Sequence, residues 1–207
     1  MNSVQIGRAV TSIGDEAFAW CEGLESITIP RSVVSFGEKP FVGCEFLREI
    51  DISENPNFVF VDGVLMDREK ARIVYCKPSK SGDYSIPNTV TTICAGAFAE
   101  CDCLRSIMIP NSMVSIGSRA FQCCKQLPSI EVPNSVKEIG DEAFASCYEM
   151  ESIAIPGSVD TLGANLFNDC YQLSEATVGG EGENLKMVDG VLFFGEMARI
   201  IWCLCEK

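Results

Sequence analysis

Histidine is absent from the 207 residues of this sequence. Its absence excludes Ser–His and Cys–His nucleophile pairs, histidine general bases and histidine-ligated zinc sites. Long apolar runs are also missing, because no stretch approaches the roughly 20 residues of a membrane-spanning helix. The first six residues lack the basic and then apolar profile of a signal peptide. We therefore expect no direct insertion into a membrane.

Basic residues are scarce relative to acidic ones. The sequence has 16 Lys and Arg against 29 Asp and Glu, which gives a formal net charge of −13. A chain this acidic repels phosphate backbones and anionic membrane surfaces, so nucleic acid is not expected as a partner. Hydrophobic residues make up 47% and charged residues 22%, which is the composition of a folded protein. Any protein or other extended partner is expected to be neutral or basic.

A 23-residue period runs through most of the chain. Six phenylalanines mark it: Phe18, Phe41, Phe98, Phe121, Phe144 and Phe167. A cysteine follows each of them three residues later: Cys21, Cys44, Cys101, Cys124, Cys147 and Cys170. An apolar-x-apolar pair then begins the next unit, as in Ile27 and Ile29. Because a unit this short cannot bury its own apolar face, the units are expected to stack into a solenoid.

Two longer units interrupt the period in the same way. Residues 57–77 and 185–205 each read as two apolar strands around a polar turn, which predicts a β-hairpin. The Asp62-Gly63 pair recurs as Asp189-Gly190, so a larger repeat of 127 residues overlies the small one. Strands ending at corresponding positions predict about eight turns, whose strands pair in parallel ~4.8 Å apart. No polar capping repeats are evident, so residues 1–207 are expected to be a segment of a longer protein that forms one solenoid domain.

The repeat unit L-x-x-I-x-I-P-x-S-V-x-x-I-G-x-x-A-F resembles the BspA-like branch of the leucine-rich repeat family, most closely between Leu104 and Phe121. The resemblance covers almost the whole chain. It implies an α/β repeat solenoid: a right-handed leucine-rich repeat superhelix with a parallel β-sheet on its concave face and two inserted hairpins. Residues Gly140 to Phe144 read as a cap and a short helical turn, with Asp141 accepting first-turn amides.

The outward residues of the sheet strands form the candidate binding surface. In each strand, the residues that flank the central apolar one should point outward, and they are mostly small or acidic. They are Ser26, Thr28, Glu49, Asp51, Ser106, Met108, Ser129, Glu131, Ser152, Ala154, Glu175 and Thr177. A partner-binding surface and an ordinary solvated sheet face both account for them, and Glu49 with Asp51 admits a calcium site as a weaker alternative.

The twelve cysteines predict packing more than chemistry. The six periodic ones lie between large apolar residues, so we expect buried thiols. Cys101, Cys103, Cys123 and Cys124 lie on adjacent turns, but their C-x-C and C-C spacing fits a zinc site poorly. Thiol catalysis needs a basic neighbour, and only Lys125 is adjacent. We expect no catalytic, cofactor-binding or metal-binding residues, and whether the other cysteines pair stays open.

These features lead us to expect a non-enzymatic protein-binding or adhesion module of a cell-surface or secreted microbial protein. The resemblance, rather than the composition, indicates the surface location. An intracellular structural or scaffold repeat protein is the alternative, favoured by the missing signal peptide and by cysteines without a disulfide pattern. The hairpin side chains Phe58, Phe60, Met66, Phe193, Phe194 and Trp202 are expected to pack onto the solenoid more readily than to bind a ligand.

Overall fold

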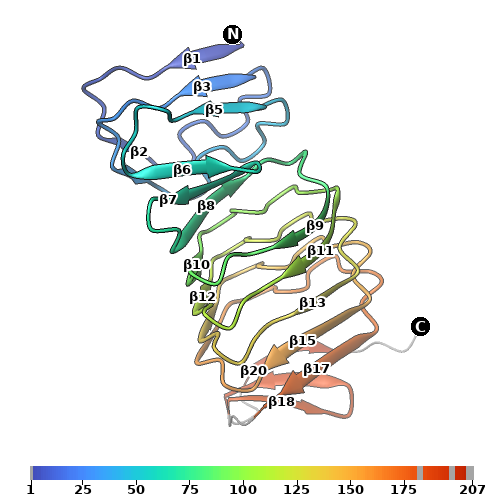
Figure 1. Ribbon diagram of the computed structural model, residues 1–207. Coiled ribbons are helices and arrows are strands. Elements are labelled where there is room, and N and C mark those ends of the chain that lie inside the picture. The colour runs from blue at the N-terminus through green and yellow to red at the C-terminus, as the bar shows by residue number, and fades with distance from the viewer. Residues whose placement is uncertain (1, 181–183, 196–198, 204–207) are drawn as a thin grey trace.

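The chain coils into about eight turns of a β-solenoid in a computed structural model that describes residues 2–180, 184–195 and 199–203 (Figure 1). Each turn contributes one strand to a first row of parallel strands. These strands are β1 (Ser3–Gln5), β3 (Ser26–Thr28), β5 (Glu49–Asp51), β9 (Gly82–Ser85), β11 (Leu104–Met108), β13 (Ser129–Glu131), β15 (Ser152–Pro156) and β17 (Glu175–Gly179). Paired residues such as Ser3 and Ser26, or Ser129 and Ser152, are one 23-residue period apart. The predicted solenoid and its parallel pairing are confirmed.

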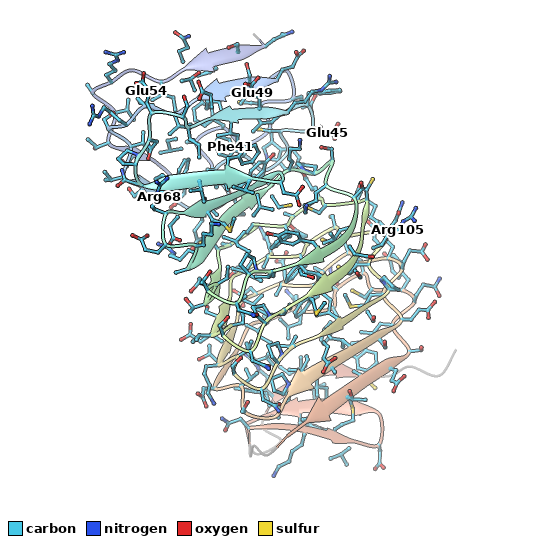
Figure 2. All side chains as sticks on the ribbon, viewed as in Figure 1. Phe41, Glu45, Glu49, Glu54, Arg68 and Arg105 are labelled. Atoms are coloured by element: carbon cyan, nitrogen blue, oxygen red, sulfur yellow. The ribbon has the colours of Figure 1, made fainter. Side chains whose placement is uncertain are left out.

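Alternation of side chains explains why these segments form strands. Ile27 and Ile29 are buried, whereas Ser26 and Thr28 on the opposite face are partly exposed. The same pattern continues along the row, with apolar residues inward and small or charged residues outward. Figure 2 shows the result: Phe41 lies among the N-terminal turns, whereas Glu54 and Arg105 project from the outside.

A second row of short strands lies on another side of the coil. Its strands are β2 (Ser12–Ile13), β4 (Ser35–Phe36), β10 (Thr92–Ile93), β12 (Ser115–Ile116), β14 (Glu138–Ile139) and β16 (Thr161–Leu162). Five of them bury one apolar residue, such as Ile93, Ile116 and Ile139, whereas Phe36 of β4 is half-buried. Strand β2 pairs with β4, and the others form a separate continuous sheet that begins at the first hairpin.

The third side of each turn carries the phenylalanine and is not helical. No helix occurs in the described parts of the chain, so the expected helical turn from Gly140 to Phe144 is wrong. Glu142 and Ser146 instead adopt positive φ angles of 53° and 58° on either side of Phe144. The amides of these three residues donate to carbonyls of the next turn at 2.7–3.2 Å. Because these donors bond laterally, no helical capping is needed, and Asp141 Oδ1 accepts from Ala164 N of the next turn at 2.7 Å.

The phenylalanines stack along the axis of the solenoid. The ring centroids of Phe98 and Phe121 are 5.3 Å apart, and those of Phe121 and Phe144 are 5.8 Å apart, with planes within 11°. Beside this stack, four of the periodic cysteines donate their thiol hydrogen to the phenylalanine carbonyl of the turn before, whereas Cys101 faces the carbonyls of Cys76 and Lys77 in the first hairpin. Cys124 Sγ lies 3.2 Å from Phe98 O, and equivalent contacts of 2.9–3.1 Å are made by Cys44, Cys147 and Cys170. The recurring spacing of Phe and Cys thus satisfies one core carbonyl in each of these four turns.

The first hairpin is a buried wall between two hydrophobic cores. It has three strands, β6 (Phe58–Val61), β7 (Val64–Asp67) and β8 (Arg72–Cys76), which pair antiparallel in sequence order. The expected two strands are therefore corrected to three, because Asp62 and Gly63 with φ of 52° and 78° form a tight turn inside the first apolar run. Leu65 and Tyr75 join the core of the first three turns, whereas Met66 and Ile73 join the core of the following turns. Figure 1 shows the first three turns displaced sideways from the rest at this hairpin.

The second hairpin repeats this arrangement at the other end. Its strands are β18 (Leu185–Val188), β19 (Val191–Phe194) and β20 (Arg199–Cys203), also antiparallel. Within the expected range of 185–205, residues 196–198, 204 and 205 lie outside the described residues. Met187, Phe194 and Trp202 pack against the preceding turns, as Phe58 and Phe60 of the first hairpin do. The expectation that hairpin aromatics pack onto the solenoid is confirmed for these residues, whereas Phe193 is half-buried on the opposite face.

Candidate functional site

The predicted binding residues lie on the outer surface of the first strand row, and we call these twelve residues the strand face. Ten of them lie on β3, β5, β13, β15 and β17, where they alternate with more buried apolar residues, and Ser106 and Met108 lie on β11. Met108 is the most exposed apolar residue among them, at 69%. The alternation that identified these residues in the sequence is thus confirmed, while their role in binding stays a prediction.

The strand face is divided by the first hairpin. Strands β1, β3 and β5 form one sheet, β9 pairs with β11, and β13, β15 and β17 form another sheet. Ser26, Thr28, Glu49 and Asp51 therefore lie on the N-terminal side of the hairpin, and the other eight residues lie beyond it. The structure does not bring Glu49 and Asp51 into one cluster with Glu131 and Glu175 at the far end.

A hollow of about 240 Å³ lies over the last three strands of the face. Six of the predicted residues line it: Ser129, Glu131, Ser152, Ala154, Glu175 and Thr177. Ser152 and Ala154 in the central strand are small, and longer carboxylate side chains flank them on β13 and β17. A depression with small residues in its floor and acids at its sides suits a neutral or cationic group.

Local hydrogen bonds fix two of the acids near the strand face. Ser106 Oγ donates to Asp83 Oδ1 on the neighbouring strand at 2.7 Å. Asp51 Oδ1 accepts from Ser53 N at 3.0 Å, and this hydrogen bond holds the pKa of the Asp51 carboxyl below its usual value. Asp51 therefore stays ionised at neutral pH and retains its attraction for cations.

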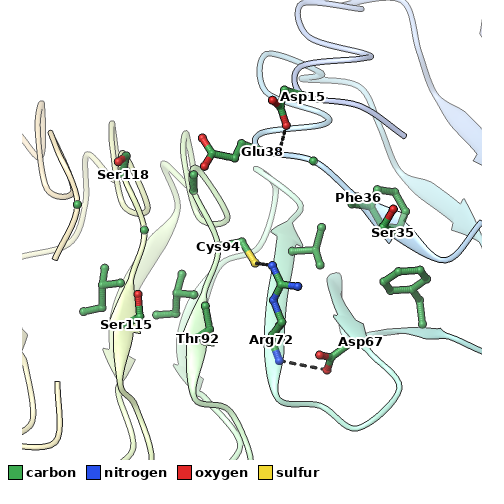
Figure 3. A pocket seen from close by; sticks show the side chains of 18 of the residues that line it. Asp15, Ser35, Phe36, Glu38, Asp67, Arg72, Thr92, Cys94, Ser115 and Ser118 are labelled. Carbon is green, nitrogen blue, oxygen red and sulfur yellow. Dashed lines mark hydrogen bonds between the residues drawn. The ribbon is translucent and has the colours of Figure 1, made fainter. Parts of the chain in front are cut away.

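A larger groove of about 680 Å³ lies on the second strand row, where the first three turns meet the rest (Figure 3). Its walls include Phe36 from β4, Arg72 from β8, and Thr92 and Cys94 at β10. The Arg72 amide donates to Asp67 Oδ1 at 3.1 Å, and its guanidinium lies 3.5 Å from Cys94 Sγ. Sequence analysis missed this groove, and its one visible signal was the break in the 23-residue period that creates the step.

The periodic cysteines pack as a ladder along the solenoid. Cys44, Cys101, Cys124, Cys147 and Cys170 are buried, whereas Cys21, in the turn that begins with β1, is exposed. Burial raises the pKa of the Cys124 thiol well above its usual value, and burial raises that of Cys44 to about 11. Cys103 is exposed and Cys123 only half-buried, so the four cysteines considered for zinc do not share an interior site. Among the described residues, no group of three or more cysteines and carboxylates lies close enough to hold a metal ion.

No helix among the described residues is long and apolar enough to cross a membrane. This finding concerns spanning helices alone.

Comparison with known proteins places these features in a family. A model of the BspA type leucine-rich repeat region matches residues 1–60 and 74–193 in six copies. No curated protein matches the sequence.

Solved structures share the fold at low identity. A leucine-rich repeat protein from Eubacterium ventriosum is 24% identical, with a TM-score of 0.71 over 85% of this chain and 54% of its own. A leucine-rich cell surface protein from Faecalibacterium prausnitzii is 23% identical, with a TM-score of 0.63 over 87% of this chain and 60% of its own. The pneumococcal vaccine antigen PcpA is 20% identical, with a TM-score of 0.59 over 86% of this chain and 56% of its own.

The chain thus spans a little over half the length of these proteins. Their likeness shows the solenoid fold, and the family model, which matches most of the sequence and six of its repeats, carries the assignment. This chain belongs to the BspA-type leucine-rich repeat family.

Proposed function

We propose that this chain is a non-enzymatic protein-binding module of a microbial cell-surface or secreted protein, and that it binds a neutral or basic partner through the strand face. The hollow over β13, β15 and β17 is the observation that carries the binding site, because it coincides with six residues chosen from the sequence alone. The solenoid exposes a row of strands on which a long partner finds a repeated surface.

Charge supports a basic partner. The net charge of −13 favours association with cations, and Glu131 and Glu175 bring carboxylates to the two sides of the hollow. Attraction between exposed charges is screened beyond ~8–10 Å at physiological salt. Affinity for a basic partner is therefore expected to fall as salt increases.

The surface location rests on relatives. Leucine-rich repeats of this family generally mediate protein–protein binding. Two structures with the same fold are described as a cell surface protein and as a vaccine antigen. These descriptions support a surface role for the proposed module.

Paired substitutions test which part of the strand face binds. An oligolysine peptide serves as the probe, and its affinity is measured by calorimetry at low and high salt. Replacing Glu131 and Glu175 with Ser should weaken binding and flatten the salt dependence, because both carboxylates at the hollow are lost. Stability should change by less than about 0.5 kcal/mol, since both residues are exposed.

Two further pairs serve as controls. Replacing Glu49 and Asp51 with Ser makes the same charge change on the other side of the first hairpin. Replacing Glu22 and Glu149 with Ser makes it at exposed positions off the strand face. Equal loss in all three variants would show binding to total charge and contradict the proposed site. Loss on Arg72→Ala alone would place the contact in the groove of the second strand row.

A further inference from the structure

An unpaired strand edge borders the groove of the second strand row, at the step between the first three turns and the rest (Figure 3). Where strands of this row pair, carbonyls of one turn accept amides of the next turn. Thr91 O accepts from Val114 N and Ile93 O accepts from Gly117 N, both at 2.8 Å. Strand β4 pairs with β2 alone, because the first hairpin replaces the strand that would follow it. The other edge of β4 is therefore open.

Two carbonyls of this open edge lack the amides that their counterparts receive. Val34 O and Phe36 O occupy the places of Thr91 O and Ile93 O in the repeat unit. No backbone amide or side chain of the described residues donates a hydrogen bond to either oxygen on the hairpin side. Both residues line the groove, and Val34 is 62% exposed. The groove thus presents backbone acceptors that the solenoid itself does not satisfy.

A proline leaves a third carbonyl open beside them. In other turns, the amide three residues after this position donates to it, as Ala120 N does to Gly117 O at 3.2 Å. In the turn of Gly37 the corresponding residue is Pro40, which has no amide hydrogen. Within the described structure no other group donates to Gly37 O. The unusual Pro40 therefore frees an acceptor next to Phe36 O, and Gly37 also lines the groove.

The second hairpin shows which chemical group binds such a pair of carbonyls. Leu162 and Gly163 are the counterparts of Phe36 and Gly37, five and four residues before the phenylalanine of their turn. The guanidinium of Arg199 in β20 donates through Nη2 to Leu162 O, and it lies 3.4 Å from Gly163 O. One arginine side chain thus serves both acceptors there.

The first hairpin provides no arginine for the pair in the groove. Arg72 in β8 is the counterpart of Arg199, 127 residues earlier. Its guanidinium lies 3.5 Å from Cys94 Sγ, on the side of β10, whereas Phe36 lies on the opposite side of the groove (Figure 3). Phe36 O and Gly37 O are therefore open to a guanidinium from another molecule.

The charge of the groove favours such a group. Five acids line it: Asp15, Glu38, Asp67, Glu69 and Glu138. Arg68 and Arg72 are the basic residues of the lining, so the groove has a net charge of −3. Glu38 directly follows Gly37 and is exposed, which places a carboxylate near the two open carbonyls. A cation entering the groove meets an attractive field.

We propose that this groove binds an extended, arginine-bearing segment of a partner protein, with the guanidinium on Phe36 O and Gly37 O. A backbone amide of the segment donates to Val34 O, as in strand addition to an open edge. The planar fork of arginine can serve two adjacent acceptors, which the compact ammonium of lysine does less well. The groove is separate from the strand face, so either site can fail without the other.

An NMR titration of the full chain tests the proposal. The probe is an uncharged Gly–Ser peptide with one central arginine, and it should shift the carbonyl ¹³C signals of Phe36 and Gly37. The same peptide with lysine should bind about 10-fold more weakly, because it loses one of two charge-assisted hydrogen bonds. N-acetylarginine amide should also bind more weakly, since it has no chain to pair along β4. Equal affinity of the arginine and lysine peptides would overturn the proposal, and equal affinity of the single residue would contradict a peptide partner.

Two variants test the named contacts. Pro40→Ala returns an amide to Gly37 O and should weaken binding of the arginine peptide about 10-fold. Its fold should persist, because alanine precedes the phenylalanine in other turns, and circular dichroism verifies this. Glu38→Gln should weaken both peptides by about 2- to 5-fold, the range for exposed charges, whereas Glu149→Gln away from the groove should not.

The strand-face variants separate this site from the one proposed above. Replacing Glu131 and Glu175 with Ser should leave the carbonyl shifts of Phe36 and Gly37 unchanged, since both acids lie outside the groove. Loss of those shifts in this variant would show that the arginine peptide binds the strand face. Absence of the shifts in the wild type, or unchanged affinity in Pro40→Ala, would also overturn the proposal.

Discussion

The phenylalanine of each repeat is the residue on which the core is built. Phe144 is fully buried and stacks between Phe121 and Phe167 at centroid distances of 5.8 and 6.1 Å. Because a ring stacks on either side, the surrounding structure can relax only a little into the cavity that forms when one ring is removed. The row of phenylalanines therefore fills the core of each turn and also holds neighbouring turns together through ring stacking.

Phe144→Ala is expected to lower the free energy of unfolding by ~3–5 kcal/mol, through lost burial and the cavity that remains. Urea denaturation at equilibrium measures the change. The matched control is Phe46→Ala, because Phe46 is 50% exposed and should cost much less. A loss below about 1 kcal/mol for Phe144→Ala would show that the ring row is not the interior of the protein.

The cysteine ladder makes a second prediction at the residue scale. Cys124 is fully buried with a raised pKa, and its thiol donates to a backbone carbonyl, so the reactive thiolate is rare at neutral pH. Native protein treated with a thiol reagent should be modified at Cys21 and Cys103, which are exposed, and spared at Cys124 and Cys147 until denaturant is added. Mass spectrometry of the labelled peptides identifies the sites. Early labelling of Cys124, or a disulfide between ladder cysteines, would contradict this packing.

At the scale of elements, a side-chain carboxylate at the first hairpin accepts a backbone amide hydrogen bond that a carbonyl of the next turn accepts elsewhere. Two residues after each phenylalanine, the amide usually donates to the next turn, as Ser146 N does to Asn168 O at 2.7 Å. The equivalent Gly43 faces the hairpin, and its amide donates to Glu100 Oε2 at 3.0 Å. Burial raises the pKa of the Glu100 carboxyl, as do the nearby acids Glu45 and Asp102, while the Gly43 amide and Lys125 oppose them.

The raised pKa of Glu100 sets the sign of a pH effect. The folded protein holds the Glu100 proton more tightly than the unfolded chain does. The resulting contribution to the free energy of unfolding is therefore full below the pKa of the unfolded state and is lost as pH rises through the pKa of the folded state. Glu100→Gln keeps an acceptor for Gly43 N without the charge. Relative to the wild type, this variant should gain stability as pH rises from about 4 to 7, measured by urea denaturation at each pH. A constant difference across this range would contradict the assignment, and Glu149→Gln at an exposed position is the control.

The elements also show what the sequence could and could not predict. Period-2 alternation located the strand face correctly, because outward residues such as Ser129 and Glu131 follow from the pairing of parallel strands. Left-handed residues beside each phenylalanine were missed, since Glu142 and Ser146 carry no preference for positive φ and glycine stands at that position only in Gly43 and Gly96. The Asp62-Gly63 pair is itself typical of a two-residue hairpin turn, but the apolar residues on both sides of it were interpreted as one strand. The groove beside Arg72 depends on the sideways step of the turns, and the break in the 23-residue period marks the place of this step without indicating its direction or size.

At the scale of the whole molecule, the two cores meet in one wall of three strands. Residues on one face of β7 and β8 belong to the first three turns, and those on the other face belong to the turns that follow. The first strand row is interrupted here, since β5 and β9 belong to different sheets. The turns on the two sides of the wall are coupled at this point by apolar side chains, by the β8–β10 pairing and by Glu100.

This shared wall also sets an order in which the chain can become stable as it leaves the ribosome. The first three turns lack Leu65 and Tyr75 until residue 75 has been made, so their apolar interior is incomplete until then. Once the wall forms, its other face is apolar and awaits Ile86 and Ile93 of the following turn. The first three turns therefore complete their core with one face of the hairpin, and the following turns then pack on its other face. The growing chain exposes one apolar wall at a time.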